Sequence, residues 1–203
     1  EIIVVNVYDK FYIIGGSSEQ NGDHTLASMD MYDMETKSWY EMNSMTIARA
    51  CFGCCVVKNR IYVIGGYTSA YTRGYSTKIY TNSVEMYDPS TNTWSLYDCL
   101  LHPRAECVAT ALYDSIYVVG GRDEKGKYLK SGEYINVTDN EPKWKKFGKW
   151  TYKIAAPAIT HLHIPGERTY NELRILTPSI QIDYSLYGKF YFCGGYDTNG
   201  GHD

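Results

Sequence analysis

Several short stretches of the chain carry residues whose types and spacing could support chemistry. Cys51 and Cys54, in the stretch CFGC, stand three positions apart, as two thiolates that share a metal ion often do. On a strand, however, these two positions point to opposite faces, and no second cysteine pair with zinc spacing follows. We interpret the cysteines as reduced residues that lie mostly among apolar neighbours in strands, which is typical of an intracellular protein: Cys51, Cys54, Cys55, Cys99, Cys107 and Cys193.

Other candidate sites are weaker. The segment GRDEKGKY, residues 121–128, nearly matches a phosphate-binding loop, but position 128 is Tyr and no helix is expected after it. His161 and His163 would share one face of a strand, yet the sequence identifies no third metal ligand. The sequon NVT at 136–138 matters only in a secreted protein. Without a GxSxG motif or a paired-carboxylate cluster, the sequence predicts no enzyme, no metal site and no cofactor.

The overall composition narrows the class of partner. A formal net charge of −3 gives no basic surplus for nucleic acid or an acidic membrane surface. The longest apolar run, ACFGCCVV at 50–57, is far too short to span a bilayer, and no signal-peptide pattern opens the chain. We therefore expect a soluble, cytoplasmic protein.

The elements that would position any site repeat along the chain. The stretch IYVIGG at 61–66 returns as FYIIGG at 11–16, IYVVGG at 116–121 and FYFCGG at 190–195. Each copy has four β-branched, aromatic or apolar residues before paired glycines, which predicts a buried strand with a sharp exit. An apolar segment and a short polar turn precede each copy, so the first two strands of each unit, a and b, form a hairpin.

A second hairpin follows the first three copies. In MDMYDMETKSW (29–39) and VEMYDPSTNTW (84–94) a Tyr precedes a Trp by seven positions, and in GEYINVTDNEPKW (132–144) by ten. We assign Tyr to strand c and Trp to the start of strand d. Each unit is thus a sheet of four short strands, and the copies start 50, 55 and 74 residues apart.

The double Gly, Tyr and Trp at these offsets resemble the kelch repeat over nearly the whole chain. The resemblance implies an all-β protein, a β-propeller built from four-stranded antiparallel kelch blades. Its structural motif would comprise Gly15, Gly16, Tyr32, Trp39, Gly65, Gly66, Tyr87, Trp94, Gly120, Gly121, Tyr134, Trp144, Gly194 and Gly195. The blades would span about 2–40, 50–96 and 104–150, with a partial fourth at about 154–203.

The fourth copy departs from the pattern. Its strand a is expected to begin near Ile180, after an insertion at 163–178, and neither the Tyr nor the Trp follows Gly195. Three blades and a partial one do not make the closed ring that the resemblance implies. We expect the remaining blades to come from missing sequence or from another chain.

The resemblance also implies a binding function. Kelch adaptors pair a BTB domain with a propeller that captures substrates for a cullin ubiquitin ligase, whereas scruin-type kelch proteins bind and crosslink actin filaments in the cytoskeleton. Both classes use a protein partner. A secreted copper oxidase propeller is a remote third alternative, although nothing in the sequence marks a copper site.

The partner site is expected where varied loops meet. In such a blade the b–c and d–a loops emerge at one end, and the a–b and c–d turns at the other. Tyr and Arg dominate interface energetics, so the candidate partner-binding residues on the b–c and d–a loops are Arg49, Tyr67, Tyr71, Arg73, Tyr75, Arg104 and Arg122. Arg49 and Arg104 have an alternative role, which is to bond backbone carbonyls around the central channel.

Overall fold

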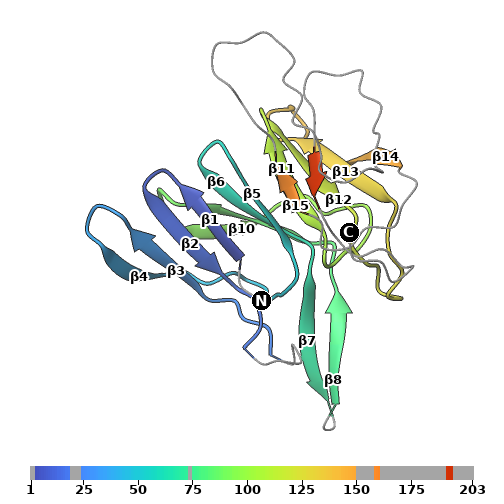
Figure 1. Ribbon diagram of the computed structural model, residues 1–203, viewed down its shortest axis with the longest axis horizontal. Helices are drawn as coiled ribbons and strands as arrows, with labels where there is room; N and C mark the ends of the chain where they lie inside the picture. The colour runs from blue at the N-terminus through green and yellow to red at the C-terminus, as the bar shows by residue number, and fades with distance from the viewer. Residues whose placement is uncertain (1–2, 19–23, 73–74, 150–157, 161–190, 194–203) are drawn as a thin grey trace.

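The computed structural model describes residues 3–18, 24–72, 75–149, 158–160 and 191–193 (Figure 1). These residues form strands, turns and loops. No helix occurs among them, so none of the described segments forms a helix that could cross a membrane.

Three sheets of four antiparallel strands follow one another along the chain. The first contains β1 (Ile3–Val7), β2 (Lys10–Ile14), β3 (Met29–Asp33) and β4 (Ser38–Met42). The second contains β5 (Gly53–Val57), β6 (Arg60–Ile64), β9 (Val84–Asp88) and β10 (Thr93–Leu96). The third contains β11 (Val108–Leu112), β12 (Ser115–Val119), β13 (Ser131–Asn136) and β14 (Lys145–Lys149). The strand before each double glycine is second in its sheet, as predicted.

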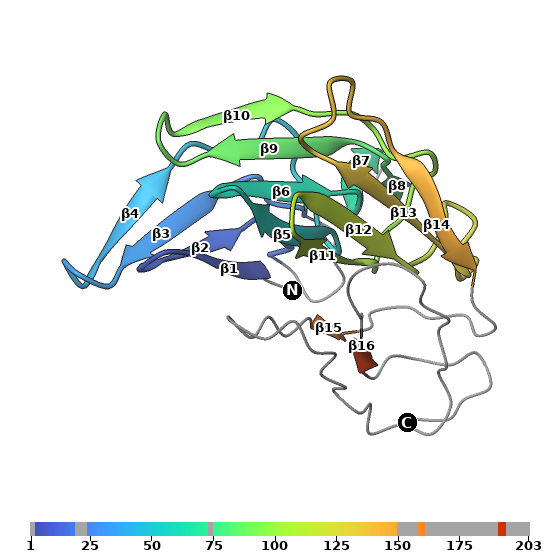
Figure 2. The same ribbon diagram turned by 90° about the horizontal axis from the view of Figure 1, so that it is seen from above.

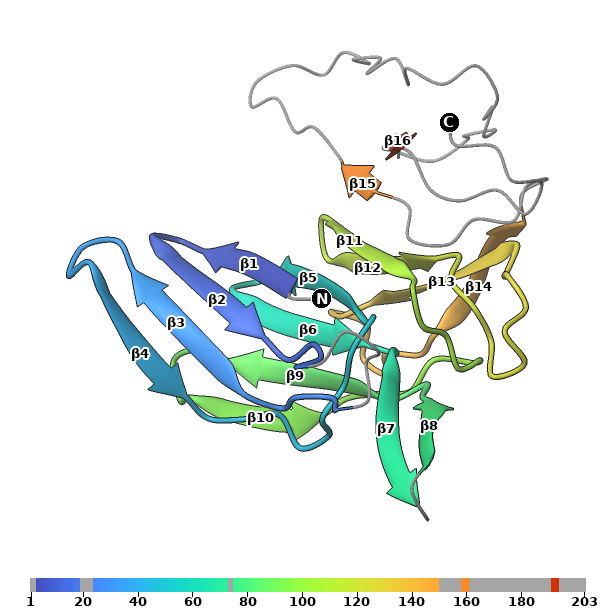
Figure 3. The ribbon, with the colours of Figure 1, turned by 60° about the horizontal axis from the view of Figure 1, so that its bottom comes forward.

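The sheets are arranged side by side in an arc (Figures 2 and 3). Their first strands, β1, β5 and β11, lie next to one another, and β4, β10 and β14 lie on the outside. Apolar side chains fill the space between neighbouring sheets. Ile61 and Tyr87 of the second sheet pack with Tyr12 and Met31 of the first, and a similar cluster joins the second sheet to the third. Each sheet therefore buries a face against its neighbour.

The double glycines allow close contact between one sheet and the loop that enters the next. Gly65 and Gly66 have φ values of 65° and 89°, a region that side chains with a Cβ rarely adopt. A Cβ on Gly65 would lie 2.4 Å from the carbonyl oxygen of Arg104. The neighbouring Gly66 N–H donates to that same oxygen at 2.8 Å. The pair thus needs glycine both for its backbone angles and for this approach.

The b–c loop of the second sheet is itself structured, which its sequence did not lead us to expect. Residues 67–82, which connect strands b and c of this sheet, contain a hairpin of β7 (Tyr67–Thr72) and β8 (Tyr75–Tyr80). Figure 1 shows this hairpin extending away from the three sheets. Its strands contain Tyr, Thr and Ile, which favour extended structure. The two strands therefore keep a regular ladder of hydrogen bonds, even though the hairpin buries little apolar area.

Two short strands are described in the region of the predicted fourth blade, at about 154–203. Strand β15 (Ala158–Thr160) pairs antiparallel with β16 (Tyr191–Cys193) and contacts β11. One neighbour of β16 is therefore made by residues 158–160, and the strand predicted to begin near Ile180 lies outside the described residues. Residues 180–189, the insertion at 163–178 and the glycines at 194 and 195 lie outside the described residues.

One motif residue is out of register. Tyr134 was assigned to the same role as Tyr32 and Tyr87, which are paired with Trp39 and Trp94. In the third sheet Glu133 takes the place of Glu85, so Ile135 takes the place of Tyr87 and is fully buried. Tyr134 points to the other face of the sheet, where it stacks on Tyr117 with ring centroids 5.6 Å apart. A shift of one position reverses the face of a strand residue, and the longer loop before Trp144 concealed this shift.

Candidate functional site

The b–c and d–a loops meet at one end of the sheets, where two of the predicted partner-binding residues are buried. Arg49 and Arg104 are both 0% exposed. Each lies four positions before the first strand of a sheet, so its side chain enters the fold along that sheet. The two arginines have equivalent contacts, which makes this arrangement a repeated structural feature.

The guanidinium groups of these arginines bind the interior of the fold. Arg104 donates from Nη1 to the carbonyl oxygens of Gly120 and Ser131, both at 2.9 Å, and from Nη2 to Glu133 at 2.7 Å. Glu133 also accepts from the backbone N–H of Leu101 at 2.6 Å. A side chain so enclosed cannot reach a partner protein. This corrects the assignment of Arg104 to partner binding and supports the alternative, carbonyl-bonding role.

Arg49 repeats these contacts one sheet earlier. It donates to the carbonyl oxygens of Gly65 and Ser83 and pairs with Glu85 at 2.7 Å, with both side chains 0% exposed. Burial lowers the pKa of the Arg49 guanidinium, and the adjacent Glu85 carboxylate opposes that shift. The Glu85 carboxylate also accepts from the N–H groups of Thr46 and Ile47. Arg49 is therefore also too buried to be a partner-binding residue. Its ion pair with Glu85 stabilises the loop between the first two sheets.

The β7–β8 hairpin is anchored at its root. Tyr67 is 4% exposed and packs with Ala50, Ala105 and the ring of Tyr80. The Nζ atom of Lys78 lies 4.5 Å from the centre of the Tyr67 ring, which is a cation–π contact. Tyr67 thus supports the hairpin from within and is not available as a contact residue.

A loop of the first sheet also braces the hairpin. The Thr25 N–H donates to Ser69 Oγ at 3.0 Å, and the Ser69 N–H donates to Thr25 Oγ1 at 3.2 Å. These reciprocal bonds join two b–c loops that are 44 positions apart in sequence. The hairpin root is therefore held by three separate segments of the chain.

The far part of the hairpin is exposed. Tyr75, at the start of β8, is 77% exposed, and Ile79 is 50% exposed. The two residues are on the same face of the strand because they are four positions apart. Tyr71 lies on β7, and Arg73 lies outside the described residues. Of the predicted partner-binding residues whose side chains are described, Tyr75 is the most accessible.

Arg122 lies at the base of the third b–c loop. Its Nε atom is 2.9 Å from Glu106, with 35% of the side chain exposed. Its guanidinium also stands over the ring of Tyr128, 4.5 Å from the centroid, and donates to the Tyr128 hydroxyl. Burial, and then the negative charge of Glu106, raise the pKa of nearby Tyr80. Arg122 therefore belongs to a polar cluster that includes residues the sequence did not identify, Glu106 and Tyr128.

Lysines carry most of the exposed charge on the described residues of the second and third b–c loops. Lys78, Lys125 and Lys127 are exposed, whereas Glu124 is the exposed carboxylate of the same loops. The predicted partner-binding set contained only Arg and Tyr residues, so it did not include these lysines. A period-two alternation of side chains within residues 67–80 was the sequence signal from which the hairpin that carries Lys78 and Ile79 could have been predicted. The face is thus an exposed hairpin beside cationic loops.

Two cysteine thiols, those of Cys54 and Cys107, are held in their protonated form by burial. Burial raises the pKa of Cys54 to about 12 and that of Cys107 to about 11, so both stay protonated near neutral pH. Within the described residues no group of three or more His, Cys, Asp or Glu is placed to hold a metal ion. His161 and His163 lie outside the described residues.

Comparison with known proteins provides the context for this architecture. Among curated proteins, the chain is 37% identical over 121 residues to an F-box/kelch-repeat protein of Arabidopsis thaliana, covering 59% of the chain and 30% of that protein. It is 34% identical over 98 residues to human Kelch-like protein 28, covering 48% of the chain and 17% of that protein. The chain thus spans less than a third of the length of these relatives.

A longer but more distant match is human Kelch repeat and BTB domain-containing protein 12, 22% identical over 204 residues, which is 98% of the chain and 30% of that protein. The solved structure of YjhT superposes with a TM-score of 0.66 at 16% identity, over 77% of the chain and 54% of that structure. This likeness confirms the predicted fold class. The model of the KLHDC2/KLHL20/DRC7 Kelch-repeats domain matches residues 1–164. The chain therefore belongs to this kelch-repeat family, and its four-stranded sheets are kelch blades of a β-propeller.

Proposed function

We propose that this chain is the substrate-recognition part of a ubiquitin-ligase adaptor, and that it captures a protein on the end where the b–c and d–a loops emerge. Kelch-like relatives support a protein-interaction module in general. The names of two relatives combine kelch repeats with an F-box or a BTB domain, and this combination supports the proposed role as a ubiquitin-ligase adaptor. The free cysteines are consistent with a cytoplasmic location for this activity.

The observation that carries the proposal is the β7–β8 hairpin. It combines an anchored root, where Tyr67 is 4% exposed, with an outer part where Tyr75 is 77% exposed. An exposed tyrosine offers a large contact area with few rotatable bonds, so its entropic cost on binding is small. Exposed Ile79 on the same strand face adds apolar area. The hairpin therefore has the composition of an interaction element.

The charge of the surrounding loops indicates the kind of partner. Among the described residues of the second and third b–c loops, Lys78, Lys125 and Lys127 outnumber the exposed Glu124. The Glu106 carboxylate is already paired with Arg122 at 2.9 Å, so it offsets little of this positive charge. We therefore expect an acidic segment of the partner to dock beside the hairpin, with charge complementarity increasing the rate of association.

The test compares protein capture by two matched variants of the full-length protein. Tyr75→Ala removes the exposed hairpin tyrosine, and Tyr113→Ala removes a tyrosine that is 70% exposed in an a–b turn at the other end. We expect partner affinity to fall at least about tenfold for Tyr75→Ala, as for other interface hot spots, and to be unchanged for Tyr113→Ala. Captured proteins are identified by mass spectrometry.

A ubiquitin-ligase substrate must also accumulate when the full-length protein is depleted from cells. Capture that is lost with Tyr113→Ala but kept with Tyr75→Ala would contradict the proposed face. If filamentous actin pellets the protein and Tyr75→Ala abolishes this, the module is an actin-binding one instead. If captured proteins keep their normal half-lives after depletion, the adaptor role is wrong.

A further inference from the structure

A pocket lies at the opposite end of the blades from the proposed protein-docking face. It is placed between the a–b turn of the first blade and the a–b and c–d turns of the second. Its volume is about 540 Å³, and Val7, Tyr8, Lys10 and Tyr12 form the wall from the first blade. Small-molecule sites commonly have volumes of about 300–1,000 Å³. The pocket is therefore large enough for a small organic ligand.

The charges that line the pocket are mostly positive. Lys10, Lys58 and Arg60 line it, and Asp88 is the one carboxylate in the lining. Asp88 already accepts from the Ser90 N–H and hydroxyl at 3.0 and 2.6 Å and is paired with Arg60 Nε at 3.1 Å. These bonds lower the pKa of Asp88, with the Ser90 hydroxyl as the largest cause. The lining thus carries more positive than negative charge. Its one carboxylate, Asp88, already has hydrogen-bond partners within the protein.

The two lysines are free to turn toward a ligand at small cost. Lys10 pairs with Asp33 at 3.2 Å and Lys58 with Asp114 at 3.5 Å, and the lysine side chains are 44% and 53% exposed. Neither Asp33 nor Asp114 lines the pocket. Exposed ion pairs of this kind contribute only about 0–1 kcal/mol, so sharing each Nζ with a bound anion costs little.

Tyr12 contributes a mostly buried aromatic ring and a hydroxyl to the pocket lining. It is 2% exposed and packs edge-to-face on Tyr87, with ring centroids 5.9 Å apart. Its hydroxyl has no hydrogen-bond partner among the residues that the structure describes, and Tyr12 lines the pocket. The Tyr12 hydroxyl is not one of the buried polar atoms that lack a partner, so it is open to water in the free protein, and a ligand oxygen can bond to it in place of that water. Val7, which is 5% exposed, and Pro89 provide apolar contact beside it.

We propose that this inter-blade pocket binds a small organic anion, in which a carboxylate or phosphate group is attached to a flat apolar body. The anionic group would contact Lys10, Lys58 and Arg60, and the apolar body would lie against Val7, Tyr12 and Pro89. Such an anion could be a free metabolite or an acidic side chain presented by a peptide. This site is independent of the protein-docking face, because the two lie at opposite ends of the strands.

Calorimetric titration of the full-length protein tests the proposal with three probes: phenyl phosphate, phenol, and a capped peptide that contains phosphotyrosine. We expect saturable binding of phenyl phosphate and at least tenfold weaker binding of phenol, which lacks the charge. Arg60→Gln and Lys58→Gln should each weaken phenyl phosphate at least fivefold, and Tyr12→Phe should weaken it while leaving the melting temperature unchanged.

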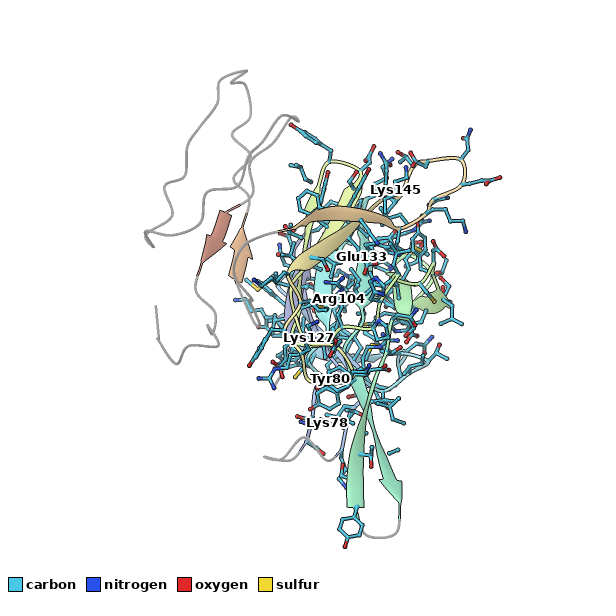
Figure 4. The ribbon with its side chains drawn as sticks, turned by 90° about the vertical axis from the view of Figure 1, so that its right-hand side faces the viewer. Lys78, Tyr80, Arg104, Lys127, Glu133 and Lys145 are labelled. Carbon is cyan, nitrogen blue, oxygen red and sulfur yellow. The ribbon has the colours of Figure 1, made fainter. Side chains whose placement is uncertain are left out.

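The matched control is Lys145→Gln. Lys145 is also a lysine in an exposed ion pair, with Asp139 at 3.6 Å, but it lies on the third blade and outside the pocket (Figure 4). Binding at least tenfold tighter to the peptide than to phenyl phosphate would support a peptide source for the anion, and the reverse a free metabolite. No saturation with either anion, equal affinity for phenol, or an equal loss with Lys145→Gln would overturn the proposal.

Discussion

At the scale of single residues, the buried ion pairs show how one side chain can join several backbone segments. Arg104 bonds two carbonyl groups and a carboxylate that is 1% exposed at its side chain. An isolated buried charge is very unfavourable, so each member of the pair depends on the other. The same unit around Arg49 makes this a feature of the repeat.

Removal of one member should therefore be costly. We expect Arg104→Ala to lower the free energy of unfolding by about 3–5 kcal/mol, because Glu133 would remain buried without its partner. Chemical denaturation of the full-length protein measures this. Lys145→Ala, which breaks an exposed ion pair, should cost no more than about 1 kcal/mol. Similar costs for the two variants would show that the burial of Arg104 does not determine its role.

The buried thiols predict a loss of stability at high pH. Burial raises the pKa of Cys54 to about 12 and of Cys107 to about 11, from an ordinary value of 9.0. A raised folded-state pKa gives stability that is fully present below pH 9.0 and declines as pH rises toward the folded value. We expect the melting temperature to fall between about pH 9 and 11, more steeply than in a Cys54→Ala, Cys107→Ala variant. Identical slopes would contradict the assignment to these thiols.

At the scale of elements, paired glycines decide how strand b leaves a blade. Gly65 serves two purposes, because its φ is 65° and a Cβ there would meet the Arg104 carbonyl oxygen at 2.4 Å. Gly126 also has a positive φ, of 73°, but a Cβ there would have nothing within 4 Å. Substitution of Gly126 would therefore introduce backbone strain alone, whereas substitution of Gly65 would add a steric clash to that strain.

This comparison gives a direct test. Gly126→Ala should destabilise the protein by about 1–2 kcal/mol, which is the cost of a left-handed backbone for an ordinary residue. Gly65→Ala should cost clearly more, because Arg104 and its loop must also move. Thermal unfolding of both variants in the full-length protein measures the difference. If the two costs are equal, close approach is not the reason for glycine at position 65.

At the scale of the whole molecule, the tryptophans of the second and third blades each contact the preceding blade. Trp94 Nε1 donates to the Asn43 carbonyl oxygen of the first blade at 2.8 Å, and Trp144 Nε1 donates to that of Asp98 in the second at 3.0 Å. Trp39 has the equivalent place in the first blade and is 57% exposed. It lies on a face that also exposes Val4 and Phe11. That face repeats the pattern by which later blades pack.

Substitution of these tryptophans should follow their burial. In the 203-residue chain, Trp144→Ala should cost about 3–5 kcal/mol, Trp94→Ala less, and Trp39→Ala about 1 kcal/mol or less. Denaturant titration of each variant gives the ranking. In a longer protein whose adjoining blade covers the face of Trp39, the destabilisation caused by Trp39→Ala should rise toward that caused by Trp94→Ala. A large cost for Trp39 in the 203-residue chain would contradict its exposure.

The repeated local signals were enough to predict the kelch architecture. Glycine pairs, strand composition and Tyr–Trp spacing act within a few neighbouring residues, so the second strand of each complete blade could be located correctly from them. The long loop between Tyr134 and Trp144 gave no such signal, and a one-position slip there assigned Tyr134 to the wrong face.

Only the tertiary structure decided which of the loop arginines are buried. Arg49 and Arg104 look like surface residues in sequence because they stand in loops, but burial depends on Glu85 and Glu133, which are 36 and 29 positions away. The same holds for the inter-blade pocket, since its lining combines turns from two blades. Local sequence determines backbone conformation through short-range sterics and propensity, whereas burial and charge pairing depend on segments that meet only after the blades have packed.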